Sequence, residues 1–321
     1  MMKLFHPENF QGSLKSRGYF EGWYFKHVAA DCSYVLAFIP GVSLSKSDPH
    51  AFIQVIDGVS GNTWYTRYEV SDFSCKNNPF TVMIGGNSFS RTGCSVDIKN
   101  AELELDADLR YADSISFPWR PLSPGIMGPF TFIPFMECNH GVVSIHHTIE
   151  GSVCMNGGDI NFNGGSGYTE KDWGKSFPEA WIWLQCNNFI GSGDTSFMLS
   201  IAKIPWLGRY FMGFLCFFYH NRHLYRFATY NRSKLFNVAF DGKKLDLSLE
   251  GKAGRLDVTA SLNRAGELKA PDRGDMTRRI KESIDSEVAL SLHDGQGKEI
   301  FTGGGKRAGL EIIDPIIDLL T

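Results

Sequence analysis

The chain has 321 residues, of which 43% are hydrophobic and 21% charged, a composition typical of globular proteins and unlike that of disordered chains. Its formal net charge of -3, from 32 basic and 35 acidic residues, creates no overall field that would attract a nucleic-acid backbone, so nucleic acid is not expected as a partner. A chain of this length exceeds what one hydrophobic core usually serves, and two domains are the natural expectation.

The cysteines and the apolar segments indicate the cellular compartment of the protein. Seven cysteines form no Cys-X-X-Cys pair, so the sequence predicts free thiols rather than a zinc site or a complete disulfide framework. The first twelve residues lack a signal-peptide pattern, and no run of about 18 apolar residues occurs. We therefore expect a cytoplasmic protein, with peripheral membrane contact as an alternative. The most apolar stretch, Tyr210 to Tyr219, is too short to span a bilayer and is expected to form a buried strand.

Strict alternation of apolar and polar residues predicts strands throughout the chain. It runs over residues 102–110 and recurs at 245–249, 256–262 and 288–292. Turn signals such as Asn156-Gly157 separate the strands and supply the positive φ angles that tight hairpins require. The only helix candidates are residues 276–283 and 312–320, the latter interrupted by Pro315. The pattern favours an all-β fold of barrels or sandwiches with few short helices.

Two stretches of the chain lack the alternating pattern of strands. Residues 117–134 contain five prolines and cannot form a central strand, so we expect either a simple crossover or a lid over a cavity. Residues 156–167 are rich in Gly and Asn and mark the predicted boundary between an N-terminal domain, residues 1–160, and a C-terminal domain, residues 161–321. No Gly-rich stretch has the strand, loop and helix context of a nucleotide site.

Two segments concentrate aromatic and ionisable residues: FEGWYFK at residues 20–26, and GYTEKDWG at 167–174, which continues into FPEAWIWLQCN at 177–187. Together with PFMEC at 134–138, these motifs resemble those of the tocopherol cyclase family. The resemblance implies two lipocalin-like β domains and closure of a prenylated hydroquinol to a chromanol. Related lipocalin-like proteins hydrate isoprenoid double bonds, and both reactions begin by protonating an alkene.

Glu170 and Asp172 are the first candidates for the acid. Two residues apart on a strand, they share a face while Lys171 points away, and two like charges on an enclosed face favour retention of a proton by one of them. An exposed polar strand end or a structural salt-bridge network is the alternative. Glu21, Glu137 and His147 are further acid candidates. For Glu21 and Glu137, an ion pair with Lys26 or Arg120 is an equally good interpretation.

Aromatic rings that face a developing carbocation stabilise it through their electron-rich faces. Substrate-binding candidates are accordingly the aromatic and amide side chains of the two motifs: Trp23, Tyr24, Trp173, Trp181, Trp183, Gln185 and Asn187. From Trp181 onward the indoles and amides alternate with small apolar residues, which places them on one face of a strand. The same stripe could equally be an inter-sheet core.

The sequence therefore predicts a tocopherol-cyclase-like enzyme that acts on a hydrophobic prenyl lipid by acid catalysis, without a metal or an organic cofactor. Its alternatives are a hydratase of an isoprenoid alkene and a non-catalytic carrier of a hydrophobic ligand. An enzyme needs a poorly hydrated carboxyl group within reach of the alkene, whereas a carrier does not.

Overall fold

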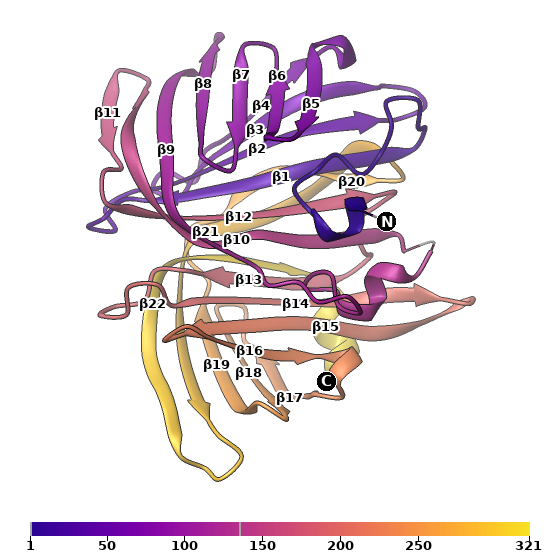
Figure 1. Ribbon diagram of the computed structural model, residues 1–321, viewed down its shortest axis with the longest axis vertical. Helices are drawn as coiled ribbons and strands as arrows, with labels where there is room; N and C mark the ends of the chain where they lie inside the picture. The colour runs from indigo at the N-terminus through magenta and orange to yellow at the C-terminus, as the bar shows by residue number, and fades with distance from the viewer. Residues whose placement is uncertain (1, 135) are drawn as a thin grey trace. The chain divides into compact units, whose positions relative to one another are not determined.

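The computed structural model describes residues 2–134 and 136–321, so Phe135 of the PFMEC motif lies outside the described residues. The structure is almost entirely antiparallel β, as predicted, and Figure 1 shows its strands and connections. All seven cysteines are free thiols. Within the described ranges, no helix is both long and apolar enough to cross a membrane.

The first sheet curls into a nearly closed barrel, with β11 paired to β10 beside the path β4-β3-β2-β1-β12-β10-β9-β8-β7-β6-β5. Three 3₁₀ turns accompany it: η1 (Met2–Phe5), η2 (Val70–Asp72) and η3 (Gly128–Phe132). The strands are β1 (Tyr19–Val28), β2 (Val35–Leu44), β3 (His50–Asp57), β4 (Thr63–Tyr68), β5 (Phe73–Asn77), β6 (Phe80–Ile84), β7 (Asn87–Ser90), β8 (Gly93–Lys99), β9 (Glu104–Ser116), β10 (Cys138–Met155), β11 (Gly158–Asn161) and β12 (Gly165–Gly174).

The second sheet runs in the order β16-β15-β14-β13-β22-β21-β19-β18-β17, with β20 paired to β21. Its strands are β13 (Trp181–Cys186), β14 (Ser196–Trp206), β15 (Arg209–His220), β16 (His223–Ala228), β17 (Lys234–Phe240), β18 (Lys244–Gly251), β19 (Gly254–Ser261), β20 (Gly266–Asp272), β21 (Asp275–His293) and β22 (Glu299–Ile313). The 3₁₀ turn η4 (Thr229–Asn231) follows β16, and the α-helix α1 (Ile316–Leu320) ends the chain.

The strands follow the alternation in the sequence. Residues 102–110 fall largely in β9, where buried apolar residues alternate with exposed charged ones. The turn between β10 and β11 contains Asn156 and Gly157, both with positive φ, as that pair of residues predicts. Each sheet buries its own apolar core, one formed by residues such as Phe38 and Leu105 and the other by residues such as Leu199 and Leu290.

The prediction of a helix at residues 276–283 is wrong, because this segment belongs to the long strand β21. Its short apolar run does not by itself distinguish a helix from a strand, and hydrogen bonding to neighbouring strands decides for the strand. At the end of the chain only residues 316–320 are helical, after Pro315. Residues 117–134 contain no strand, as the prolines predict.

The chain forms two compact units that do not divide at residue 160. The first comprises residues 2–57, 62–177 and 267–280, and the second comprises residues 58–61, 178–266 and 281–321. The first unit continues past the predicted boundary because β12 pairs with both β1 and β10. It also takes in the β20–β21 hairpin, where the Gln54 amide exchanges hydrogen bonds of 3.0 and 2.9 Å with the Lys269 backbone.

Candidate functional site

The GYTEKDWG motif forms β12, which lies between β1 and β10 in the first unit. Successive side chains on a strand point to opposite faces, so Tyr168, Glu170 and Asp172 share one face while Lys171 lies on the other. Directly paired residues of neighbouring strands share a face as well. This places Tyr24, the partner of Glu170, on the acidic face of the sheet.

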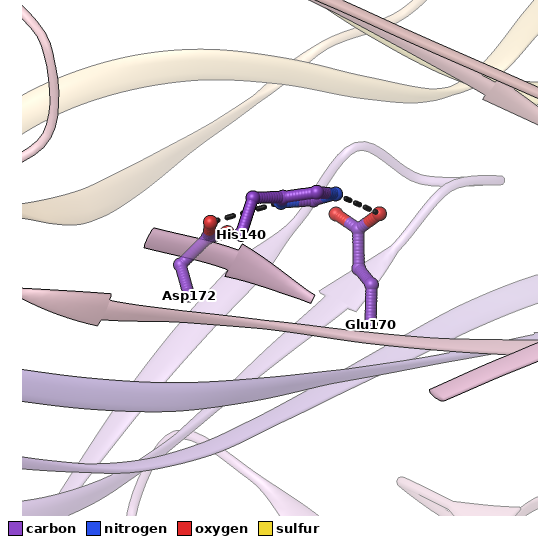
Figure 2. Close-up of side chains that lie close together, drawn as sticks. All are labelled: His140, Glu170 and Asp172. Atoms are coloured by element: carbon purple, nitrogen blue, oxygen red, sulfur yellow. Dashed lines mark hydrogen bonds and ion pairs between the residues drawn. The ribbon is translucent and has the colours of Figure 1, made fainter. Parts of the chain in front are cut away.

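His140 is the partner of Asp172 on β10, and its imidazole lies between the two carboxylates (Figure 2). Its Nδ1 is 2.9 Å from Asp172 Oδ1, and its Nε2 is 3.4 Å from Glu170 Oε2. The Tyr168 hydroxyl donates to Glu170 Oε2 at 2.6 Å. We call these four residues, Tyr168, His140, Glu170 and Asp172, the acid cluster.

The acid cluster is enclosed to different degrees at its two ends. The whole Glu170 residue is only 4% exposed, whereas the Asp172 side chain is 26% exposed. The backbone N–H of His140 donates to Met127 Sδ at 3.1 Å, which places the proline-rich segment against the cluster. Water therefore reaches the Asp172 end more readily than the Glu170 end.

The two carboxylates determine the charge of the imidazole. Burial by itself lowers the pKa of His140, but Glu170 and Asp172 together outweigh burial and hold that pKa well above its ordinary value. Burial, and then the Glu170 carboxylate, raise the pKa of Tyr168 well above its usual value. At neutral pH the acid cluster thus holds a proton on His140 between two potential acceptors, and the Tyr168 phenol stays protonated.

Three members of the acid cluster, His140, Glu170 and Asp172, offer a donor set for a divalent cation, because their ligand atoms lie within 4.8 Å of one another. However, the two carboxylates approach opposite nitrogens of the imidazole ring. One cation bound by a single imidazole nitrogen could not contact both carboxylates without a rearrangement. The geometry fits a shared proton better than a metal.

The opposite face of β12 carries a fully buried ion pair between Lys171 and Glu21. Lys171 also donates to Asn9 O at 2.5 Å, and its ammonium lies 4.7 Å from the Trp23 ring and 4.9 Å from the Trp173 ring. The expected ion-pair partners of Glu21, Lys26 and Arg120, are therefore replaced by Lys171, which the strand register places diagonally across from Glu21 on the same face. Trp23 and Trp173 lie on this face, away from the acid cluster.

Glu21 is also saturated with hydrogen bonds. It accepts from the backbone N–H groups of Gln11 at 2.8 and 3.1 Å and of Gly12 at 3.1 Å, and from the Tyr19 hydroxyl at 2.5 Å. With these donors and the ion pair to Lys171, both carboxylate oxygens of Glu21 are engaged inside the protein. This geometry supports the structural interpretation of Glu21.

The two remaining acid candidates are His147 and Glu137. His147 is buried on the inner face of the first sheet, where its Nδ1 lies 3.0 Å from Ser144 Oγ and its ring packs 4.3 Å from that of Tyr111. Burial, with smaller contributions from two neighbouring histidines, lowers its pKa well below the ordinary value. Glu137 is half-buried before β10, and its backbone carbonyl accepts from Lys175 N at 2.8 Å.

The four other binding candidates belong to the second unit. Trp181, Trp183 and Gln185 alternate along β13 with residues of the apolar core, as expected, and all are buried. The Trp181 indole donates to Glu311, and the Gln185 amide donates to Asn187 Oδ1 at 3.2 Å. These indole and amide side chains lie together within the second unit.

The profile of the family described as tocopherol cyclase-like matches residues 119–313. The chain belongs to the tocopherol cyclase-like family. The matched range contains the whole acid cluster, whereas FEGWYFK lies before it.

Curated relatives agree with this assignment. The chain is 25% identical over 189 residues to a probable chloroplastic tocopherol cyclase of Oryza sativa subsp. japonica and to a chloroplastic tocopherol cyclase of Zea mays. The alignments cover 56% of this chain and 40% of each relative. The chain thus matches less than half the length of these relatives.

Solved structures share the fold of this tocopherol cyclase-like chain. CghA with Sch210972 superposes with a TM-score of 0.57 at 11% identity, covering 92% of this chain and 88% of CghA. Kievitone hydratase from Nectria haematococca gives 0.53 at 10% identity, with coverages of 96% and 94%. A putative AttH from Nitrosomonas europaea gives 0.52 at 12% identity, with 91% of each chain covered. The predicted lipocalin-like all-β fold is confirmed.

Sequence reasoning placed Glu170 and Asp172 together but missed His140 and Tyr168. Tyr168 could have been found, because its spacing of two from Glu170 inside the motif puts both on one face. His140 precedes Asp172 by 32 residues, and no sequence pattern joins them. Only the pairing of β10 with β12 does so.

Proposed function

We propose that this tocopherol cyclase-like protein is an enzyme that protonates an isoprenoid double bond and closes a prenylated hydroquinol to a chromanol. The observation that carries the proposal is the imidazole of His140, which lies between the carboxyl groups of Glu170 and Asp172 at a poorly hydrated position. A protein that only binds hydrophobic ligands does not need a buried group that donates a proton. An acid catalyst of alkene addition does.

The reaction needs a group that gives one proton and takes one back. A proton from the acid cluster adds to the CH carbon of the trisubstituted alkene, and the π electrons that form the new C–H bond leave a tertiary carbocation. The phenolic oxygen attacks that cation to form the C–O bond, and the phenolic proton returns to the cluster. Atoms and charge balance, and the overall change is an isomerisation.

The two ends of the acid cluster suit different parts of this cycle. The enclosed Glu170 end, backed by the Tyr168 hydroxyl, is the better place for transfer to the alkene because water would capture the carbocation. The more exposed Asp172 end is the better route for proton exchange with solvent. The acidic side chains of Glu170 and Asp172 flank His140, and acidic groups at this position favour a nearby cation.

Hydration and ligand carriage are the two alternative functions that the experiment below distinguishes from cyclisation. Hydration of an isoprenoid alkene uses the same first step, with water in place of the phenol as nucleophile. A carrier would bind the lipid without any turnover. The alignments cover less than half the length of each cyclase relative, so cyclase activity of this chain is a proposal.

The test is turnover of a short-chain prenylated hydroquinol in detergent micelles, prepared in D₂O. We expect a chromanol with deuterium at the former CH carbon of the alkene. Glu170→Gln, Asp172→Asn and His140→Gln should each lower kcat by roughly 10²–10⁴, the range typical of general acid–base groups, while substrate binding persists. Exposed strand residues offer matched controls, Glu104→Gln and Asp106→Asn on β9, which should keep the parent rate.

The products separate the alternatives. A tertiary alcohol in place of the chromanol would assign hydration. Binding of the hydroquinol without any product would assign carriage. Full activity in all three cluster variants would refute the acid cluster as the proton source.

A further inference from the structure

The hairpin between β14 and β15 ends in an exposed apolar tip. Trp206 is 43% exposed, Leu207 89% and Tyr210 51%, and Pro205 beside them is also exposed. Figure 1 shows these two strands as a long hairpin. Scattered exposed apolar residues are ordinary, but several side chains at one turn form a feature that calls for a physical reason.

The residue at the apex is an unfavourable choice for the turn itself. Leu207 has a φ of +47°, a left-handed conformation that Gly, Asn and Asp adopt far more readily than a branched apolar side chain. Gly208 follows with a φ of +77°, as expected for a two-residue hairpin turn. Neither turn stability nor hydration explains the leucine, so its role lies in contact with something outside the hairpin.

The backbone of the tip suits an apolar environment. The β14–β15 pairing continues to Pro205 with Tyr210 and Trp206 with Arg209, immediately before the turn. A polar backbone group that enters lipid without a partner is strongly disfavoured, and regular strand pairing limits the number of such groups. The side chains can therefore leave water with little exposed backbone.

The surrounding sequence is basic. Between Asp194 and Asp241 there is no Asp or Glu, but this stretch holds six cationic side chains, in a chain whose net charge is -3. These residues are Lys203, Arg209, Arg222, Arg226, Arg232 and Lys234, of which Lys203 and Arg209 lie on the half of the hairpin that ends in the tip. Arg209 is exposed at the tip, while Lys203 lies 4.7 Å from the Tyr210 ring and pairs with Glu179. Trp and Tyr beside Arg are the residues that favour the headgroup layer of a bilayer.

We propose that the hairpin tip, residues 205–210, docks on the surface of a phospholipid bilayer that carries anionic lipids. Trp206, Leu207 and Tyr210 enter the boundary between headgroups and acyl chains, and Arg209 contacts lipid phosphates. A stable protein partner typically covers about 800 Å² on each side, far more than three side chains at the end of one hairpin present. Membrane docking of the tip does not depend on the proposed function.

The test is co-sedimentation of the full chain with vesicles of phosphatidylcholine, with and without phosphatidylglycerol. We expect binding that strengthens with phosphatidylglycerol. Leu207→Asn should weaken it about ten- to hundredfold, the loss that follows from no longer burying one leucine side chain. Asn is well suited to a positive φ, so this variant should keep the hairpin folded. Arg209→Gln should reduce the difference between the two vesicle types.

Ile190→Asn is the matched control, because Ile190 is 69% exposed and lies in the connection before β14, at the strand end opposite to the tip. It should bind as the parent does. Brominated lipid should quench tryptophan fluorescence in the parent and less in Trp206→Phe. The proposal is overturned if the parent binds no vesicles, if Leu207→Asn and Ile190→Asn bind alike, or if Leu207→Asn instead dissolves a dimer seen without lipid.

Discussion

Breaking the buried pair between Glu21 and Lys171 should strongly destabilise the first unit. Both side chains are fully buried, so removing one leaves an uncompensated charge in a low-dielectric interior. Such changes cost about 3–5 kcal/mol. In Lys171→Met the carboxylate keeps its donors from Gln11, Gly12 and Tyr19, whereas in Glu21→Gln the ammonium loses its anionic partner and keeps Asn9 O and the two indole faces.

Glu21→Gln should therefore be the more damaging variant, unless Lys171 loses its proton. Burial already lowers the pKa of Lys171, against the opposing effect of Glu21, so removal of the carboxylate lowers that pKa further. The double variant Glu21→Gln with Lys171→Met removes both charges and combines the same two single substitutions. It should recover part of the loss, because it leaves no uncompensated charge in the interior.

Urea unfolding followed by tryptophan fluorescence measures these effects, with the transition of the first unit analysed separately if two transitions appear. Lys99→Met is the control, because Lys99 and Asp97 form an exposed pair at 3.5 Å that should contribute at most about 1 kcal/mol. Losses below about 1 kcal/mol in both single variants would show that the pair is not buried as described. A double variant as unstable as the sum of the singles would show that the two charges do not interact.

Two further predictions concern the same unit. Burial lowers the pKa of His27 to about 3, so the unfolded chain takes up a proton first as pH falls, and stability should decline between about pH 6.5 and 3 by on the order of 5 kcal/mol from this group. His27→Gln should flatten that part of a plot of unfolding free energy against pH; an unchanged slope would contradict the assignment. Gly174→Ala should cost roughly 2–4 kcal/mol, because Gly174 has a φ of +152° and a Cβ would lie 2.2 Å from Glu137 O. Gly86→Ala, where a Cβ meets nothing within 4 Å, should change thermal stability little; equal losses in both would refute the steric explanation.

Local residue patterns were sufficient to predict the fold class and the local geometry of the candidate site. Alternation of period two is a local property, so the strand at residues 102–110 and the shared face of Glu170 and Asp172 follow from the residues alone. The same rule placed Lys171 and Trp173 on the opposite face. The motifs identified the family, which the match to residues 119–313 confirms.

Contacts between residues far apart in the chain depend on how the strands pair. The pairing of β12 with β10 brings His140 between the two carboxylates, and the pairing of β12 with β1 sets Lys171 beside Glu21 rather than leaving Glu21 to Lys26 or Arg120. Likewise, the short apolar run at 276–283 became a strand, and the hairpin containing Lys269 joined the first unit. Strand pairing depends on contacts between segments far apart in the chain, and no local pattern of side chains records which strand will be the neighbour.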